Sequence, residues 1–293
     1  MTELSQKRAG LILGSLTADA LSLGAHWIYE TDLLSQKFGY IKSYHAPGID
    51  SYHPHKQAGD QSHIGDQALR LADFLSRENT WNAESFTQDW LAMWPTYDDY
   101  FDHATKMTLE HIKAGSNLLE AGSESSELAG PARIAPLVAF LANETEDHVI
   151  AAVIEQTRLT HNSDKAIEAA TFLAIASYRL IHGAELQPTL EATAPAWALQ
   201  QAKAALKFDT IEAIHQLGQS CAIDNALPAA LYFAFKYGDD LPKAFSENAI
   251  AGGDNCTRGL ALGMLLGAAH GSAAIPEEWR KQLNAEIPQA LLN

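Results

Sequence analysis

Apolar residues recur along the chain at intervals of three and four, the spacing of one face of an α-helix, and the alternation typical of β-strands is almost absent. The pattern predicts an all-α protein. The expected helices cover residues 8–23, 65–76, 82–97, 100–114, 135–141, 146–157, 163–182, 197–206, 209–217, 226–237, 241–249 and 255–270.

No long Gly/Ser linker, low-complexity segment or fixed-period repeat divides these helices, so we expect one compact multi-helix domain over residues 1–293. Gly, Pro, His and Ser collect in three expected loops, at 39–64, 115–136 and 223–227. The first loop is long for a compact domain, and long ordered loops often bind ligands. Its three histidines at 45, 53 and 55 are irregularly spaced, which favours a solvated lid over a metal site.

Small residues stand four apart in the first and the last of the long predicted helices. They are Gly10, Gly14 and Ala18 in the first helix, and Gly259, Gly263 and Gly267 in the last. Each mid-helix glycine costs about 1 kcal/mol relative to alanine, so the pattern needs a compensating reason, and close backbone packing supplies one. We therefore expect a central helix pair, with Asp19 near the end of one helix and Asp254 at the beginning of the other.

Composition and charge narrow the classes of protein. The chain has 293 residues, of which 47% are hydrophobic, enough for a large core. A net charge of -16 repels polyphosphate, so we expect no nucleic-acid partner and no membrane partner. The first residues lack the apolar stretch of a secretory signal. The two cysteines, Cys221 and Cys256, form no CxxC pair, which favours a reduced, cytoplasmic setting.

The sequence GGDNCTR directly precedes the last long helix. Gly252 and Gly253 permit a tight turn, and the helix start after it offers unpaired N–H groups that attract anions such as phosphate. Asp254 or Asn255 can cap this helix, with Thr257 in its first turn. The alternative interpretation is a capped helix and nothing more.

Cys256 and Arg258 share that first turn. A helix N-terminus and a neighbouring cation lower the pKa of a thiol, so Cys256 is a candidate nucleophile, with His63 as its partner. Burial raises the pKa of a thiol, however, and a small unreactive wall residue is the interpretation that we favour.

A second polar group occurs where Gly-Asp-Gln appears twice, at residues 59–61 and 65–67, on either side of Ser62 and His63. Hydroxyl, imidazole, carboxylate and amide groups meet at the start of a predicted helix. Such groups can hold a metal, a sugar hydroxyl or a water. The alternative is a helix cap beside a solvated loop.

The order of five motifs resembles the ADP-ribosylglycohydrolase family, which includes the dinitrogenase-reductase-activating glycohydrolases and the J-type crystallins. The motifs are RAGLILGSLTADALSLGAHW at 8–27, GPARIAPL at 130–137, THNSDKAIEAA at 160–170, the block at 227–271 that contains GGDNCT, and IPEEW at 275–279. The resemblance runs nearly end to end and is closest to the J-type crystallin branch.

The resemblance implies a compact all-α fold around two magnesium ions and cleavage of the glycosidic bond at the C1″ ribose carbon of ADP-ribose. The family's Thr-Asp-Asp metal motif falls on Ser62, His63 and Ile64, and Cys256 replaces one aspartate of the closing block. The implied metal ligands that remain are Asp254, Thr257 and Ser62. Because magnesium prefers six oxygen ligands, we expect it to bind weakly at most.

The resemblance and the two polar groups together give the candidate site. The catalytic candidates are Asp254, His63, Asp66 and Cys256. The candidates for substrate binding are Asp19, Ser62, Gln67, Gly130, Arg133, His161, Gly252, Gly253, Asn255 and Arg258. For Arg133 the alternative is a surface ion pair, and for His161 it is a structural role at a helix start.

Three hypotheses follow. The first is a hydrolase of N- or O-glycosidic linkages of ADP-ribose or a nucleoside-like glycoside, with an altered metal site; its partner is that small molecule or an ADP-ribosylated protein. The second is an inactive ligand-binding or crystallin-like structural protein on the same fold. The third is an enzyme that depends on Cys256.

Overall fold

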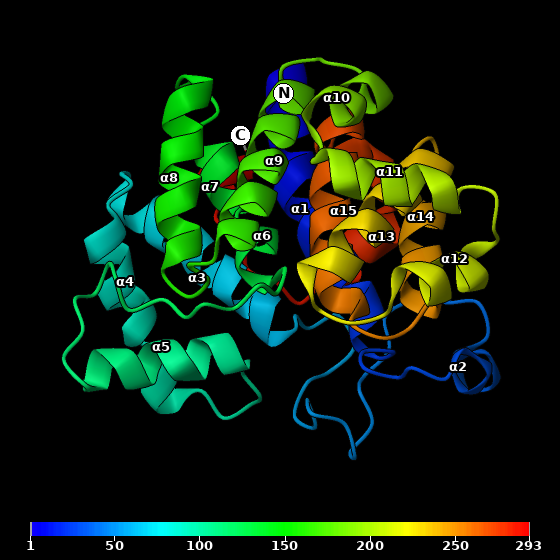
Figure 1. Cartoon of the computed structure of the whole chain (residues 1–293), viewed down its shortest axis with the longest axis horizontal. Helices are drawn as coiled ribbons and strands as arrows, with labels where there is room; N and C mark the ends of the chain where they lie inside the picture. Colours follow the sequence, from blue (N-terminus) through cyan, green and yellow to red (C-terminus); the bar gives the residue numbers. More distant parts are fainter. Residues whose placement is uncertain (1, 293) are drawn as a thin grey trace.

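Helices form the regular structure of residues 2–292, which are the residues that the computed structural model describes (Figure 1). This part of the chain contains no β-strand, only two isolated bridges, between Ser123 and His161 and between Glu127 and Ala222. The all-α prediction is therefore confirmed.

The helices follow one another in the order of the chain. They are α1 (Glu3–Leu23), α2 (Thr31–Phe38), α3 (His63–Glu78), α4 (Ala83–Leu91), α5 (His103–Lys113), α6 (Ala129–Ala132), α7 (Ala135–Phe140), α8 (Glu146–Arg158), α9 (Asp164–Ile181), α10 (Leu186–Thr193), α11 (Ala196–Ala205), α12 (Thr210–Leu217), α13 (Ile223–Tyr237), α14 (Leu241–Ile250), α15 (Asn255–His270), α16 (Glu277–Gln282) and α17 (Gln289–Leu292). Two 3-10 turns, at Trp94–Thr96 and Ser272–Ala274, complete the set.

Several predicted boundaries were wrong. The helix expected over 82–97 ends at Leu91, and a 3-10 turn that contains Pro95 follows, because proline cannot continue the hydrogen-bond ladder. The helix expected from residue 100 begins at His103, since the carboxylate of Asp102 caps it by accepting from Thr105 N at 2.6 Å. The loop expected at 223–227 is the first turn of α13.

Other short elements were not predicted. Helix α6 interrupts the loop expected at 115–136, and α2, α10, α16 and α17 lie in segments that we assigned to no helix. The long loop expected at 39–64 is present over residues 39–62, since α3 begins at His63.

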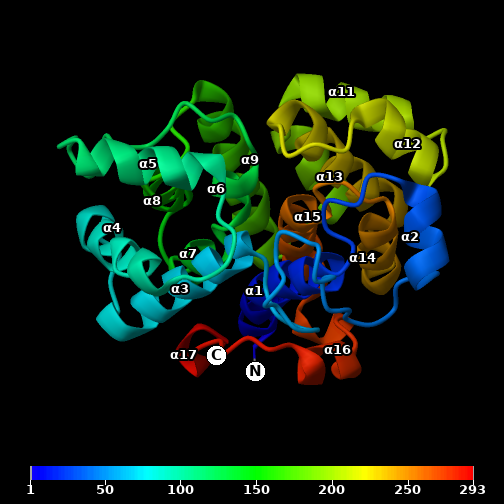
Figure 2. The same cartoon turned by 90° about the horizontal axis from the view of Figure 1, so that it is seen from below.

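Helices α1 and α15 run side by side through the middle of the molecule (Figures 1 and 2). A Cβ atom built on Gly10 or Gly14 would lie far inside contact distance of a backbone carbonyl of α15, and one built on Gly263 or Gly267 would meet the backbone of α1 in the same way. Ser15 joins the two backbones by donating its hydroxyl to Leu260 O at 3.1 Å. The predicted central pair is confirmed.

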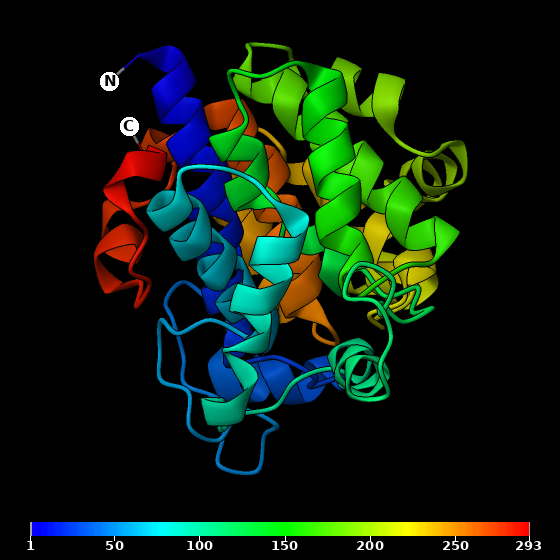
Figure 3. The same cartoon turned by 90° about the vertical axis from the view of Figure 1, so that its left-hand side faces the viewer.

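The other helices surround this pair. Helices α13 and α14 pack on α15, α7 and α9 pack on α1, and α3 packs on α7 (Figure 2). Figure 3 shows α17, in red, beside α1. One cluster of buried apolar side chains connects these elements, including Leu16 of α1, Leu71 of α3 and Leu262 of α15. No helix in residues 2–292 combines the length and the apolar character needed to cross a membrane.

We expect Gly263→Ala to lower the free energy of unfolding by about 2 kcal/mol, since overpacking against a rigid backbone outweighs the gain of about 1 kcal/mol in helix propensity. Urea unfolding measures the change. Gly48→Ala is the control, because its Cβ would meet only Lys37 Nζ, at 3.7 Å. A variant at residue 263 as stable as the wild type would show that the two helices separate at no cost.

Candidate functional site

The candidate site lies where α1 ends and α15 begins, at the lower end of the pair in Figure 1. Trp27 N donates to Gly253 O at 2.9 Å, and Gly253 N returns a bond to Ile28 O at 2.9 Å. Gly252 and Gly253 have φ angles of 67° and 66°, and a Cβ on either would collide with a neighbouring carbonyl. The predicted tight turn is therefore present, and glycine is required at both positions.

The two polar segments identified in the sequence, residues 59–67 and 252–258, meet at Asp19 of α1. The carboxylate of Asp19 accepts from Ser62 N at 2.8 Å and from Ser62 Oγ at 2.7 Å, while Cys256 Sγ lies 3.5 Å from Asp19 O. Burial raises the pKa of Asp19 to about 7, although the bonds from Ser62 oppose the shift. Asp19 therefore holds the site together and has no surface open to a ligand, since its exposure is 0%.

The residues at the start of α15 bond mainly to one another. Asp254 caps the helix by accepting from Thr257 N at 3.2 Å, and Asn255 Nδ2 donates to Ala249 O at 3.0 Å. Arg258 donates from Nε to Asn248 Oδ1 at 2.7 Å and from Nη2 to Asn248 O and Gly252 O at 3.0 Å.

Arg258 is fully buried, and burial lowers its pKa to about 10. Its bonds fix the turn before α15, while its Nη1 is buried without a partner. The assignment of Arg258 to substrate binding stays a prediction. Its neighbour Asn255 likewise faces inward: its Oδ1 lies 3.1 Å from His26 Nδ1.

Arg133 is also buried instead of facing a phosphate. Its guanidinium donates to Gln67 Oε1 and, at 2.6 Å, to Thr160 Oγ1. Gln67 Oε1 accepts a further bond from Trp90 Nε1 at 2.9 Å. The surface ion pair expected as the alternative for Arg133 was wrong, because the side chain is buried, while a ligand contact by Arg133 or Gln67 stays a prediction.

His161 and Gly130 pack against this network. His161 Nδ1 lies 2.8 Å from Thr160 Oγ1, and the ring packs so closely on Gly130 that a Cβ there would lie 2.7 Å from Nδ1. His161 has an exposure of 0%, which agrees with the structural alternative and not with a ligand contact.

Asp66 is likewise already paired. Its Oδ2 accepts from Lys56 Nζ at 2.5 Å and from Tyr97 OH at 2.6 Å. Burial raises the pKa of Asp66, against the charge of Lys56. We therefore assign Asp66 to the anchoring of the long loop between α2 and α3, and not to catalysis.

A stack of rings forms one wall of the site, and sequence reasoning missed it. His26 stacks on Trp27 with ring centroids 4.1 Å apart, Trp27 on His53 at 5.5 Å, and His53 on His63 at 5.5 Å. We call these four residues the imidazole column. Tyr100 meets the Trp27 ring edge-on at 4.8 Å. Trp27 adopts a φ of 60°, which is rare for a side chain of this size.

The histidines of the column are neutral or paired. Burial lowers the pKa of His26 to about 4 and that of His53 to about 2. His53 Nδ1 lies 3.2 Å from Asp99 Oδ1, and His63 Nε2 lies 3.5 Å from Asp102 Oδ2. Burial acts to raise the pKa of Asp102, but the bond and the charge of His63 outweigh it and hold that pKa below its usual range. The expectation of a solvated His53 was wrong.

Glu127 is a second residue that sequence reasoning missed, because it lies in an irregular loop with no periodic signal. It accepts from Cys221 Sγ at 3.2 Å, and Asp254 N donates to Gln219 O at 2.8 Å. Glu127, through its side chain, and Asp254, through its backbone, thus both bond to the short segment from Gln219 to Cys221. Burial raises the pKa of Glu127, and the charges of Asp102 and Asp254 add to the effect.

The residues at the family's metal positions do not fit a pair of magnesium ions. Ser62 Oγ is engaged with Asp19, His63 is a nitrogen donor paired with Asp102, and Ile64 has no ligand atom. Thr257 Oγ1 is buried without a partner, but magnesium takes six oxygen ligands. Among residues 2–292, no three His, Cys, Asp or Glu side chains are grouped to hold a metal.

Cys256 is unsuited to act as a nucleophile. Its exposure is 0%, and burial raises its pKa well above the usual value, while the charges of Asp19 and Asp254 raise it further and Arg258 only partly opposes them. The wall-residue interpretation agrees with this arrangement.

In the native protein at neutral pH we expect iodoacetamide to leave Cys256 unlabelled and to react slowly with Cys221, which is partly exposed. Peptide mass spectrometry reads out both sites, and labelling of both thiols in urea is the control. Faster labelling of Cys256 than of Cys221, with loss of activity, would restore the nucleophile hypothesis.

His161 should make the protein sensitive to acid. Burial lowers its pKa from 6.5 to about 4. Between these two pH values the unfolded chain is protonated at His161 and the folded chain is not. The stability it contributes is present above pH 6.5 and is lost as the pH falls toward 4. From about pH 7.5 to about pH 5 this loss is about 2 kcal/mol.

Between those two pH values, the free energy of unfolding of His161→Asn should fall by about 2 kcal/mol less than that of the wild type. Urea unfolding at both pH values measures the difference. His148→Asn is the control, since 53% of the His148 side chain is exposed. Equal pH dependence in the wild type and in His161→Asn would contradict the expectation.

Comparisons with known proteins agree with the fold and the motifs. The sequence profile of the ADP-ribosylglycohydrolase family matches residues 1–292. Crystallin J1A of Tripedalia cystophora is 23% identical over 92% of this chain and 89% of its own, and crystallin J1B of the same animal is 21% identical over 94% and 92%. A solved structure described as "ADP-ribosylglycohydrolase-related protein complex" superposes with a TM-score of 0.77 at 22% identity, covering 100% of this chain and 96% of that one. The chain therefore belongs to the ADP-ribosylglycohydrolase family.

Proposed function

We propose that the protein hydrolyses the N- or O-glycosidic bond of an ADP-ribose-like or nucleoside-like substrate, free or attached to a protein, by means of two carboxyl groups and without a magnesium pair. The observation that carries the proposal is that Glu127 and Asp254 both contact the short segment Gln219 to Cys221, Glu127 through its carboxyl group and Asp254 through its backbone N–H. Glu127 accepts a bond at Oε1 from Cys221 Sγ, and Asp254 accepts one at Oδ1 from Thr257 N, so within residues 2–292 the second oxygen of each carboxyl group is left for a ligand.

The two carboxyl residues have environments suited to opposite roles. The raised pKa of Glu127 favours the protonated form, which a general acid needs. Asp254 stands at the N-terminus of α15, where the helix dipole favours a negative charge. Glycoside hydrolysis commonly uses such a pair.

The chemistry then divides between them. Glu127 gives its proton to the departing nitrogen or oxygen as the bond to the sugar carbon breaks. Asp254 takes a proton from the water whose oxygen forms the new bond to that carbon. The products are a free sugar hydroxyl and a protonated leaving group, and proton exchange with solvent restores both carboxyls.

Tyr100 is near enough to feel the charges of both carboxyl residues, and it supports the same assignment. Burial raises the pKa of Tyr100 to about 12, and the charges of Asp102, Glu127 and Asp254 contribute to the shift. The Tyr100 hydroxyl therefore stays protonated at neutral pH and serves as a donor to a substrate hydroxyl between the two carboxyls.

A second candidate function is ligand binding without turnover. It is supported by the internal pairing of Arg133, Gln67 and Asp66 and by the likeness to two proteins named crystallins. In both candidates we propose that magnesium binds weakly, because Asp254 is the only carboxylate left at a matching position.

We expect Glu127→Gln to lower the rate of release of ADP-ribose from an ADP-ribosylated peptide by about 100-fold, because the amide cannot donate the acid proton. Chromatography of released ADP-ribose measures the rate, and calorimetry with ADP-ribose shows whether binding is kept. The exposed Glu124→Gln is the matched control.

Adding EDTA or magnesium should change the wild-type rate little. Loss of turnover in EDTA would contradict the metal-free mechanism. Binding of ADP-ribose without turnover in the wild type would favour the second candidate.

A further inference from the structure

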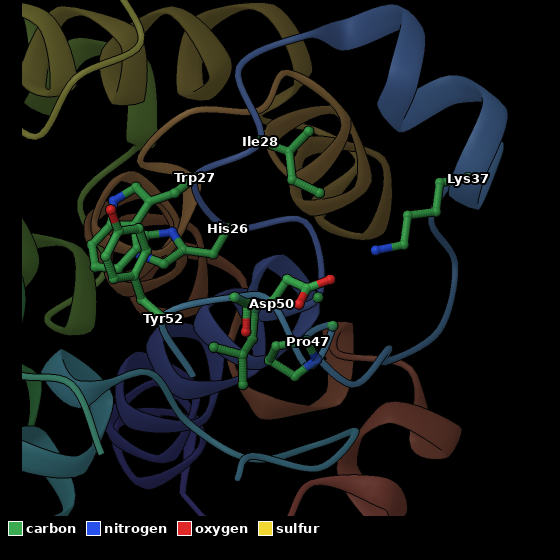
Figure 4. A pocket seen from close by; sticks show the side chains of 11 residues that line it. His26, Trp27, Ile28, Lys37, Pro47, Asp50 and Tyr52 are labelled. Atoms are coloured by element: carbon green, nitrogen blue, oxygen red, sulfur yellow. The ribbon is translucent and has the colours of Figure 1, made fainter. Parts of the chain in front are cut away.

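A pocket of about 270 Å³ lies beside the imidazole column, between the end of α1, helix α2 and the loop at 47–52 (Figure 4). Ile28 and Pro47 give it apolar walls, and Trp27 and Tyr52 close one side. None of the residues proposed above to act in catalysis lines it.

Two opposite charges line this pocket and remain unpaired. Lys37 comes from α2 and Asp50 from the loop, and neither takes part in an ion pair within residues 2–292. The ammonium of Lys37 lies close to the loop backbone, since a Cβ on Gly48 would be 3.7 Å from Lys37 Nζ. In Figure 4 both side chains extend toward the pocket.

His26 adds ring surface to the pocket wall. Its exposure is 7%, its ring stacks on Trp27 with centroids 4.1 Å apart, and its Nδ1 lies 3.1 Å from Asn255 Oδ1. Its Nε2 is buried and therefore offers no contact to an occupant of the pocket.

An exposed aromatic side chain lines the pocket. Tyr52 is 64% exposed, and Ile49, from the same loop, is 79% exposed. The Tyr52 ring stands edge-on to Trp27, with centroids 5.0 Å apart. A flat, partly apolar ligand would cover this surface by stacking.

The size of the pocket limits the occupant. Small-molecule sites range from roughly 300 to 1,000 Å³, and a volume of about 270 Å³ lies near the lower limit. It suits one base, one ribose and one phosphate, but not a dinucleotide.

We propose that this pocket binds a nucleoside monophosphate. The base stacks on Tyr52 and lies against Ile28 and Pro47, the ribose diol donates to the Asp50 carboxylate, and the phosphate pairs with Lys37. The inference goes beyond the proposed hydrolysis, because it requires binding alone at residues outside Glu127 and Asp254.

Calorimetry with AMP, adenosine and inorganic phosphate tests the proposal. Lys37→Gln should weaken AMP binding about tenfold and leave adenosine binding unchanged, since only AMP carries the phosphate. Asp50→Asn should weaken both ligands about tenfold, because the ribose is common to them. The matched controls are Lys42→Gln and Asp32→Asn, which remove the same charges from nearby positions outside the pocket.

Three results would overturn the proposal. They are the absence of binding by AMP and adenosine at millimolar concentration, equal weakening of AMP and adenosine by Lys37→Gln, and binding of inorganic phosphate as tight as that of AMP. Lys37 and Asp50 are exposed, so neither variant should unfold the chain.

The outcome is separable from that of the proposed hydrolysis. Glu127→Gln should bind AMP like the wild type, because Glu127 does not line the pocket. An inactive wild-type protein that still binds AMP through Lys37 and Asp50 would refute the hydrolysis and support the pocket. An active protein that binds no AMP would support the hydrolysis and refute the proposed nucleotide pocket.

Discussion

The contact between the backbones of α1 and α15 sets the position of every group in the site. Gly14 and Gly263 face each other with no side chain between them, so the two helix axes come closer than other residues would permit. This approach brings the carbonyl of Asp19 to the thiol of Cys256, 3.5 Å away. A wider spacing would part the α15 turn from Ser62, which Asp19 holds on the other side.

The same constraint explains why so many polar groups at the site are internal. Tight packing buries Arg133 and Arg258, and buried guanidinium groups must find acceptors. They find amide, hydroxyl and backbone oxygens instead of carboxylates, although Arg258 Nη1 is buried without a partner, and the two arginines fix the geometry of the surrounding turns. The proposed hydrolysis therefore depends on Asp254 and Glu127.

Sequence patterns predicted the parts of the molecule that depend on local chemistry. Glycines spaced four residues apart predicted the helix pair, and Gly252 with Gly253 predicted the tight turn. Both features depend on the absence of a side chain, which is visible in the sequence. The burial of Arg133 was not predictable, because its acceptors Gln67 and Thr160 come from distant segments.

The imidazole column escaped prediction for a similar reason. Its rings come from the end of α1, the long loop and the start of α3, and ring stacking leaves no periodic trace in a sequence. Glu127 escaped because an acid in a Ser-rich loop is usually solvated, and only the fold places it beside Cys221.

The loss of the magnesium ligands and the gain of the imidazole column form one consistent electrostatic change. Carboxylates clustered without a cation repel one another, and at least one of them would be forced to take up a proton. Replacement by His63 and Ile64 removes that repulsion, and stacking of His63 on His53 fills the space with rings. Asp19 retains a carboxyl there, but burial raises its pKa to about 7 and Ser62 supplies two donors, so either charge state is accommodated. The repulsion that remains acts on Glu127, because the charges of Asp102 and Asp254 help burial to raise its pKa, and the proposed role of Glu127 as an acid depends on that shift.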